Sequence, residues 1–196
     1  MQLTREDFQK FLYTYNEDEL FYRTLYFEKK EHPETFHKFC LNLDCDLISR
    51  RQLYVPELQK EGWHSYFEEK AMFCDTADNI MLYKHYRYTP EFIHEHEFFE
   101  ILCIYDGQAH TSIQGIEHTL HKGDVCIIPP QTKHSIGIFD EMISFNILVR
   151  GSTFQSTFFQ SLTEDSAQTH FFAHVVYRKT EGNYLIVHTA NDPQIR

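Results

Sequence analysis

The chain has 196 residues, of which 42% are hydrophobic and 16% aromatic, and its formal net charge is -11. This apolar content excludes a disordered chain, and the length suits one domain with an appendage. The acidic balance repels phosphate, so it excludes these residues as a DNA-binding surface.

The cysteines and the apolar runs bear on the cellular compartment. The five cysteines are an odd number without a Cys-x-x-Cys pair, so we expect reduced, buried thiols. The N-terminus has no apolar signal core, and no run approaches the ~18 apolar residues of a membrane span. We therefore expect a cytoplasmic protein without a membrane segment.

Residues 1–78 are predicted to form a helical N-terminal extension. Thr4 and Asp7 have the spacing of a capping box at the start of a helix. The helical repeat that follows consists of Phe8, Phe11, Leu12 and Tyr15. This apolar stripe either packs on the core of its own chain, which we favour, or forms a dimer surface.

The stretch 17–75 is ambiguous between helix and strand. One side of a second helix would carry Leu20, Phe21, Thr24 and Leu25, but the aromatic and β-branched mixture also allows a strand. A short packed helix is expected around Trp63, Tyr66 and Phe67. No residue pattern in this third of the chain indicates chemistry.

Residues 79–150 are predicted to form a barrel of short strands. Strands are expected at 79–89, 98–105, 110–113, 116–120, 125–128 and 142–149. Turns are marked by Asp106-Gly107, Gln114-Gly115, Gly123-Asp124 and Pro129-Pro130. Strands at roughly 8–12-residue spacing with such turns predict a sandwich or a small barrel.

Residues 151–196 return to a helical pattern. Ser152 and Gln155 have capping-box spacing, and the apolar face that follows consists of Phe154, Phe158, Phe159 and Leu162. A further helix is expected from Ser166, and 184–187 is a short apolar segment. Asn191-Asp192-Pro193 has the pattern of a helix start but lies next to the last residue, Arg196. We expect a chain cut from a longer protein, with a frayed terminus as the alternative.

One constellation of histidines and a glutamate indicates a binding site. His94 and His96 are followed by Glu100 and, much later, by His134. A His-x-His pair alone is expected about 0.9 times by chance in this composition, whereas the pair with Glu100 and Gly107 is expected about 0.003 times. The pattern is therefore specific enough to carry a hypothesis.

The spacing of these residues has geometric consequences. Side chains alternate along a strand, so His94 and His96 point to the same face. Glu100 would lie about 13 Å along a straight strand, so a bend or bulge near Glu97-Phe98 is needed to bring it back. His134 must arrive from a separate strand, which we expect across the barrel interior.

Three roles are open for this set. His94, His96, Glu100 and His134 could hold a divalent transition metal, because imidazole and carboxylate ligands suit Fe, Mn, Co, Ni, Cu or Zn. They could instead line a pocket for a small effector such as a sugar, with apolar walls from Phe98 and Tyr105. The third alternative is solvent-exposed histidines at a barrel mouth.

At these residues the sequence resembles a cupin. His94, His96, Glu100 and Gly107 match the first cupin motif, and the second motif is matched by Gly123, Pro129 and His134. Three positions depart from the family pattern, because glycine is usual at Tyr88 and Gln131 and asparagine at Ile138.

The closer resemblance is to the sensor domain of AraC-type transcription regulators. The segments that resemble the family lie at 85–90, 94–101, 123–130 and 144–147, and similar segments lie in the tail at 152–154, 171–172 and 183–186. The resemblance implies a mainly β fold with flanking helices: a cupin-like β-barrel (double-stranded β-helix), an N-terminal helical segment and C-terminal dimerisation helices. It also implies a homodimer that reads DNA through a C-terminal region with two helix-turn-helix motifs, absent from this chain.

The expected function is therefore effector sensing and dimerisation without catalysis. The alternative is a metal-dependent cupin enzyme, such as a dioxygenase or isomerase, with its metal on His94, His96, Glu100 and His134. A stand-alone sugar-binding or interaction cupin is the third reading. The sensor reading predicts that residues 1–196 alone do not bind DNA tightly, and the enzyme reading predicts turnover that requires His134.

Overall fold

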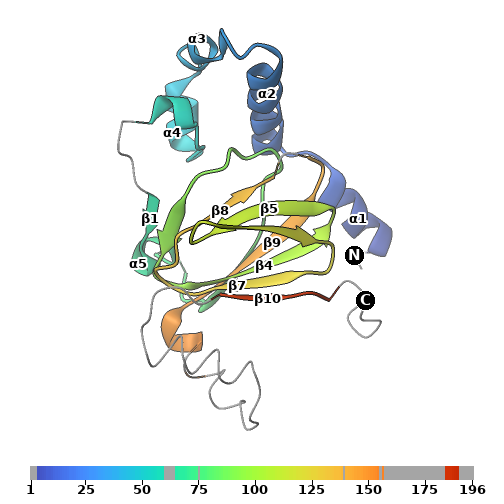
Figure 1. The fold of residues 1–196 in the computed structure, drawn as a ribbon, viewed down its shortest axis with the longest axis vertical. Coiled ribbons are helices and arrows are strands. Elements are labelled where there is room, and N and C mark those ends of the chain that lie inside the picture. Colours follow the sequence, from blue (N-terminus) through green and yellow to red (C-terminus); the bar gives the residue numbers. More distant parts are fainter. Residues whose placement is uncertain are drawn as a thin grey trace.

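The computed structural model describes residues 4–59, 65–74, 76–138, 140–154, 156 and 184–189. Two five-stranded sheets enclose the core, and helices α2, α3 and α4 form a separate layer beyond one end of them (Figure 1). The prediction of a mainly β barrel with N-terminal helices is confirmed. None of the helices described is long and apolar enough to cross a membrane.

The first helix, α1 (Arg5–Tyr13), begins with the predicted capping box between Thr4 and Asp7. Its apolar stripe does not pack as expected: Leu12 is 1% exposed, but Phe8 is 41% and Phe11 70% exposed. The helix is attached by its C-terminal end, where the Tyr13 hydroxyl donates to Asp106 at 2.5 Å. The earlier turns therefore remain in solvent.

The ambiguous stretch is helical at α2 (Glu17–Glu31), whose capping box joins Asn16 and Glu19. Its buried face carries Tyr22 and Leu25, whereas Leu20 is exposed. Thr24 is exposed as well, so the predicted face was wrong at Leu20 and Thr24. Three short helices follow: α3 (Phe36–Cys40), α4 (Cys45–Arg50) and the 3-10 helix η1 (Pro56–Leu58).

The helix expected around Trp63 is not found. Tyr66 and Phe67 belong to a strand, β1 (Ser65–Phe67), and Trp63 lies outside the described residues. The two aromatic residues suit a strand, and β1 completes the edge of a sheet by pairing in parallel with β3. A one-turn helix, α5 (Glu69–Met72), follows it.

The first sheet has the order β1-β3-β8-β5-β6 and the second β10-β7-β4-β9-β2. The strands are β2 (Ile80–Lys84), β3 (His94–His96), β4 (Phe99–Asp106), β5 (Gln108–Ile113), β6 (Ile116–His121), β7 (Val125–Ile128), β8 (His134–Gly137), β9 (Ile143–Val149) and β10 (Leu185–Val187). The strands expected from the sequence are confirmed except at 85–89, because β2 ends at Lys84 and a turn follows it. β1 and β10 join the sheets from outside residues 79–150, so the barrel draws on all three predicted segments.

The core lies between the sheets and includes Leu102 and Ile104 from β4 with Ile113 and Leu120 from β5 and β6. The other face of the second sheet is also covered, because Phe154 stacks on Phe99 with ring centroids 3.7 Å apart. Burial on both faces explains the continuous apolar run of β4.

Residues 151–154 are helical, as expected for this segment, but the helix already includes Gly151, so Ser152 is not the N-cap that its spacing suggested. The remaining predictions for this segment fall outside the described residues: Gln155, Phe158, Phe159, Leu162, Ser166 and Asn191-Asp192-Pro193. The dimerisation helices therefore stay a prediction.

The thiols are free, as expected, but burial applies to only some of them. Cys40 and Cys126 are buried, Cys103 is intermediate, and Cys45 and Cys74 are exposed. The prediction of buried cysteines was therefore wrong for Cys45 and Cys74, which belong to none of the hydrophobic clusters in the described part of the chain.

Candidate functional site

The site is built at the corner where the chain passes from one sheet to the other. His94 and His96 lie on β3 in the first sheet, and Glu100 lies on β4 in the second. Between them, the amide of Glu97 donates to the carbonyl of Phe67 at 3.0 Å, which fixes the corner against β1. The predicted bend near Glu97-Phe98 is therefore confirmed, and it turns Glu100 back toward the histidines.

His134 comes from a separate strand, as expected, but not from across the barrel. It lies on β8, the antiparallel neighbour of β3, in register with His94. The two imidazole rings have centroids 4.1 Å apart. The position of His134 was mispredicted because spacing along the chain does not reveal which strands become neighbours.

Two backbone carbonyls fix the tautomers of His94 and His134. Nδ1 of His94 lies 3.2 Å from the carbonyl of Phe92, and Nδ1 of His134 lies 2.9 Å from the carbonyl of Thr132. A carbonyl can only accept, so each Nδ1 carries the proton and donates it. In the neutral imidazole, the Nε2 atom then presents a lone pair.

Glu100 lies among these histidines and is 3% exposed. Its Oε2 atom is 3.1 Å from Nε2 of His96 and 3.3 Å from Nε2 of His134. Burial alone would raise the pKa of Glu100, but the interactions with His134 and His96 outweigh burial and hold its pKa well below the usual range. Glu100 is therefore a carboxylate at neutral pH.

Burial has the opposite consequence for His94. Desolvation, together with the neighbouring His134, lowers the pKa of His94 to about 3. His94 is thus a neutral imidazole at physiological pH, which is the form that accepts a hydrogen bond or binds a metal.

His96 differs from the other two histidines. Its ring stacks on Phe98, with centroids 4.4 Å apart and an interplanar angle of 12°. Its Nε2 atom contacts Glu100, and its Nδ1 atom is buried without a hydrogen-bond partner in the described part of the chain. The geometry makes His96 a support that orients the carboxylate of Glu100.

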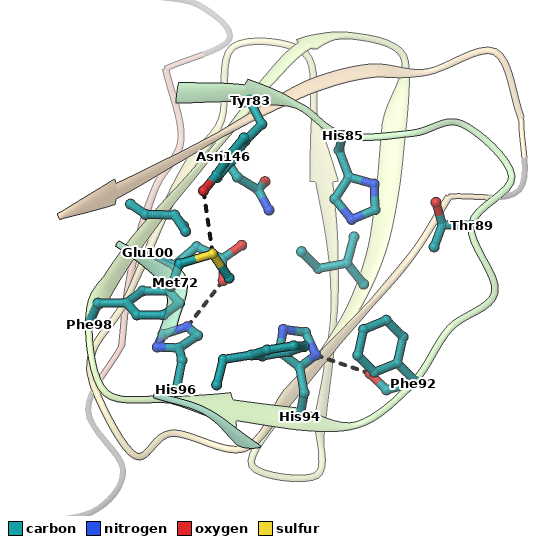
Figure 2. A pocket seen from close by; sticks show the side chains of 13 residues that line it. Met72, Tyr83, His85, Thr89, Phe92, His94, His96, Phe98, Glu100 and Asn146 are labelled. Atoms are coloured by element: carbon teal, nitrogen blue, oxygen red, sulfur yellow. Dashed lines mark hydrogen bonds and ion pairs between the residues drawn. The ribbon is translucent and has the colours of Figure 1, made fainter. Parts of the chain in front are cut away.

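These residues face a cavity of about 170 Å³ inside the barrel (Figure 2). The lining residues are Phe67, Met72, Tyr83, His85, Thr89, Phe92, His94, His96, Phe98, Glu100, Ile136, Asn146 and Leu148. Among them Glu100 is the charged carboxylate, and neither lysine nor arginine occurs in this lining. The cavity alone therefore disfavours a free anion and suits a small polar molecule with apolar faces.

The wall opposite the histidines was missed by the sequence reasoning. Tyr83, His85 and Asn146 come from β2, the residue after it and β9, and their side chains surround the open space in Figure 2. The Oδ1 atom of Asn146 and the Oε1 atom of Glu100 are buried without hydrogen-bond partners among the described residues. The available signal was alternation, because Asn146 shares the inward parity of the buried Ser144 and Leu148.

The structure does not bring Tyr105 to this cavity. Phe98 lines it as expected, but Tyr105 points to the outer face of β4 and lines a depression shared with Tyr13 and Phe145. Glu100 and Tyr105 differ by an odd number of positions, so alternation along β4 already opposes a common cavity.

The residues present fit a divalent metal. The ligand atoms of His94, Glu100 and His134 lie within 4.8 Å of one another. Both histidines donate Nδ1–H to backbone carbonyls, as metal-bound histidines commonly do, and so turn Nε2 toward Glu100. Two imidazole nitrogens and one carboxylate form a donor set for Fe, Mn, Co, Ni, Cu or Zn. Of the four predicted ligands, His96 is the one that this geometry leaves out.

The two missing glycines of the cupin pattern have a structural counterpart. Tyr88 and Gln131 both adopt left-handed backbone conformations, with φ of 62° and 60°. Glycine adopts this region without steric cost, whereas other L-residues pay about 1–2 kcal/mol. Both positions therefore have the backbone conformation that glycine favours. The amide of Gln131 uses it to donate to the carbonyl of His96 at 2.8 Å.

The two sheets, the corner between β3 and β4 and the His/Glu cavity define a cupin-like barrel with an internal cavity. The sequence profile of the AraC-like ligand binding domain matches residues 81–186, and the chain belongs to this family. The match begins in β2 and ends in β10, so it includes His94, His96, Glu100 and His134.

Comparison with solved structures finds other cupins at low similarity. KdgF from Halomonas is 17% identical, with a TM-score of 0.34, over 37% of this chain and 70% of that chain. A cupin protein from Bacteroides fragilis is 21% identical, with a TM-score of 0.31, over 46% and 72%. Oxalate decarboxylase from Bacillus subtilis is 20% identical, with a TM-score of 0.33, over 41% and 24%. No curated protein matches the chain.

Proposed function

We propose that this chain is the effector-sensing module of an AraC-type transcription regulator and that its effector binds in the barrel cavity. One observation carries the proposal: Glu100 Oε1 and Asn146 Oδ1 are buried in the cavity wall without partners among the described residues. An unpaired buried acceptor costs free energy, and a ligand that donates hydrogen bonds to both would remove that cost.

The size of the cavity limits the effector. A cavity of about 150 Å³ holds benzene, so about 170 Å³ accommodates roughly one six-membered ring. A donor-rich ring such as a monosaccharide would place hydroxyls on Glu100 and Asn146. Phe92 and Phe98 would supply its apolar contacts.

The binding experiment is a thermal-shift panel of monosaccharides and cyclic polyols. A ligand at about 100 times its Kd should raise the Tm by about 5–10 °C. Asn146→Leu and Glu100→Gln should each reduce the shift, since each removes one acceptor from the cavity. Ser152→Ala, outside the barrel, is the control and should respond like the wild-type chain. A panel without any shift, or shifts that both cavity variants retain, would contradict the proposal.

A bound metal is a second candidate at the same site. The observation that favours it is the pair of Nδ1–H donations to Phe92 and Thr132, which leaves the Nε2 atoms of His94 and His134 as the ligand atoms beside Glu100. His94, Glu100 and His134 would hold the ion, which would supply Lewis acidity to a bound oxygen ligand. The residues of the chain would orient and desolvate that ligand.

Elemental analysis of the purified chain separates the metal from the metal-free reading. About one transition metal per chain is expected in the wild type and in His96→Gln, because His96 supports Glu100 without reaching the ion. His94→Ala should lose the metal, since it removes one of the three ligands. Metal-free protein with an intact fold would rule out the metal and leave effector binding as the remaining proposal. Turnover that depends on the metal would instead favour a cupin enzyme.

The proposed regulatory role requires parts beyond the barrel. A dimer and a DNA-binding region would convert effector binding into a change in transcription, because a ligand shifts only an equilibrium between states that it binds unequally. A fusion of residues 1–196 to a dimer-dependent DNA-binding domain tests this role. Reporter expression should change with a ligand from the panel in the wild-type fusion and not in Asn146→Leu. An unresponsive fusion that still binds the ligand would contradict the sensing role.

A further inference from the structure

A second cavity, of about 470 Å³, lies in the helical layer and is separate from the barrel site. Its walls come from α2, α3, η1 and the segment after Arg87, and its lining residues are Leu25, Tyr26, Lys29, Lys30, Phe36, Pro56, Glu57, Tyr88, Pro90 and Glu91. Its volume falls in the ~300–1,000 Å³ range of small-molecule sites. No residue of the barrel cavity contributes to it.

The floor of this cavity is apolar and ordered by packing. Leu25, Phe36 and Tyr88 are 3%, 5% and 6% exposed and belong to one hydrophobic cluster. Tyr88 holds its place despite a left-handed backbone, because its ring packs 5.2 Å from that of Tyr26 and its hydroxyl donates to Glu141. The floor therefore presents rigid aromatic surface, which favours a flat aromatic ligand.

The charged side chains at the rim differ in whether they have a partner. Lys29 is neutralised by Glu57, with Nζ and Oε1 2.8 Å apart. Glu91 accepts a hydrogen bond from the Ser135 hydroxyl at 2.6 Å, which ties it to β8. Lys30 has no ion-pair partner in the described part of the chain, and its Nζ lies 5.8 Å from the Tyr26 ring centroid. An ammonium group is thus available next to an aromatic floor.

We propose that this second cavity binds an aromatic carboxylate, with the ring on the floor formed by Leu25, Phe36 and Tyr88 and the carboxylate on Lys30. The barrel cavity has no lysine or arginine in its lining, whereas the second cavity has Lys30, which forms no ion pair among the described residues. The site does not depend on the proposed function of the barrel, because the two cavities share no lining residue.

The test is calorimetric titration of the full 196-residue chain with 2-naphthoate as the probe. Binding at one site per chain is expected, and Lys30→Gln should weaken it about fivefold, the size of effect that one solvent-exposed ion pair provides. The uncharged probe 2-naphthalenemethanol should bind equally to the wild type and to Lys30→Gln. Lys38→Gln, on α3 outside the cavity, should match the wild type.

Asn146→Leu separates this site from the barrel site. It should leave 2-naphthoate binding unchanged, whatever it does to a barrel ligand. The proposal is overturned by an absence of 2-naphthoate binding, by equal affinities of the wild type and Lys30→Gln, or by loss of binding in Asn146→Leu. Tighter binding of 2-naphthylmethylamine than of 2-naphthoate would overturn it as well, because the charge preference would then be reversed.

Discussion

Arg87 and Glu19 form a buried ion pair that anchors the helical layer on the barrel. They are 1% and 0% exposed, and Arg87 contacts both Glu19 oxygens, through Nη2 at 2.9 Å and Nε at 3.0 Å. Lys84 adds a third contact at 2.9 Å, and the Arg87 guanidinium lies 3.7 Å from the Tyr15 ring centroid. No local sequence pattern marks Glu19 as part of an ion pair, because its buried partner lies 68 residues away.

Removing Arg87 should be costly because it leaves Glu19 buried with fewer partners. Arg87→Met is expected to lower the free energy of unfolding by about 3–5 kcal/mol. Lys122→Gln is the matched control, because Lys122 pairs with Asp106 at the surface and its loss should cost less than about 1 kcal/mol. Urea unfolding of both variants measures the difference. Equal costs would contradict the anchoring role.

The same pair predicts a dependence of stability on pH. Burial alone would raise the pKa of Glu19, but hydrogen bonds from Arg87 and Lys84 outweigh it and lower the pKa below its ordinary value of 4.5. A lowered pKa in the folded state contributes stability above pH 4.5 that is lost as the pH falls through the folded pKa. The stability difference between the wild type and Glu19→Gln should therefore shrink below pH 4.5, measured by urea unfolding. A stability difference between the wild type and Glu19→Gln that grows as the pH falls would contradict this prediction.

Gln131 has a backbone conformation that is strained for glutamine and that glycine would adopt without strain. Its φ is 60° and its side chain is exposed, so Gln131→Gly should relieve strain without removing packing. After the larger chain entropy of glycine is subtracted, a gain of about 0.5–1 kcal/mol in unfolding free energy is expected. Gln108→Gly, at the start of β5, should destabilise instead. Chemical denaturation measures the free energy of unfolding of the two variants. Destabilisation by both substitutions would contradict the strain argument.

At the scale of elements, the segment from His85 to His94 connects the two layers of the molecule. Thr89 and Phe92 line the barrel cavity, whereas Tyr88, Pro90 and Glu91 line the second cavity. One segment therefore contributes to both sites. Neighbouring residues of this segment serve different cavities, so movement of its backbone would alter both walls together.

The start of the C-terminal segment is attached to the outer face of the second sheet. Phe154 is 0% exposed and stacks on Phe99, so Phe154→Ala should cost about 3–5 kcal/mol. Phe11→Ala is the control, because Phe11 is 70% exposed and its loss should change stability by less than about 0.5 kcal/mol. Thermal or urea unfolding compares the two. A small loss in Phe154→Ala would show that this attachment contributes little.

Strands were more predictable than the site they form. Alternation and turn residues located β4, β5, β6, β7 and β9, because the turns at Gly107, Gly115 and Gly123 all adopt positive φ, as such turns require. β8 was expected only as the separate strand that carries His134. Local pattern also predicted the convergence of His94, Glu100 and His134. It could not supply Tyr83, His85 and Asn146, since their inward position depends on which strands pair.

At the scale of the whole molecule, two sheets and a helical layer hold two cavities of different character. The barrel cavity carries the Glu100 carboxylate, and the helical cavity carries the Lys30 ammonium at its rim. The net charge of -11 is consistent with the proposal that DNA contact belongs to another region of the regulator. The central claim remains that the barrel cavity binds a small effector through Glu100 and Asn146.

Native mass spectrometry tests that claim most directly. The purified chain and its Asn146→Leu variant are each incubated with the small-molecule fraction of a cell extract and analysed under identical conditions. Effector binding in the barrel predicts one small-molecule adduct per chain in the wild type, and this adduct should be absent or strongly reduced in Asn146→Leu. The same adduct at equal occupancy in both proteins, or no adduct in either, would contradict effector binding in the barrel.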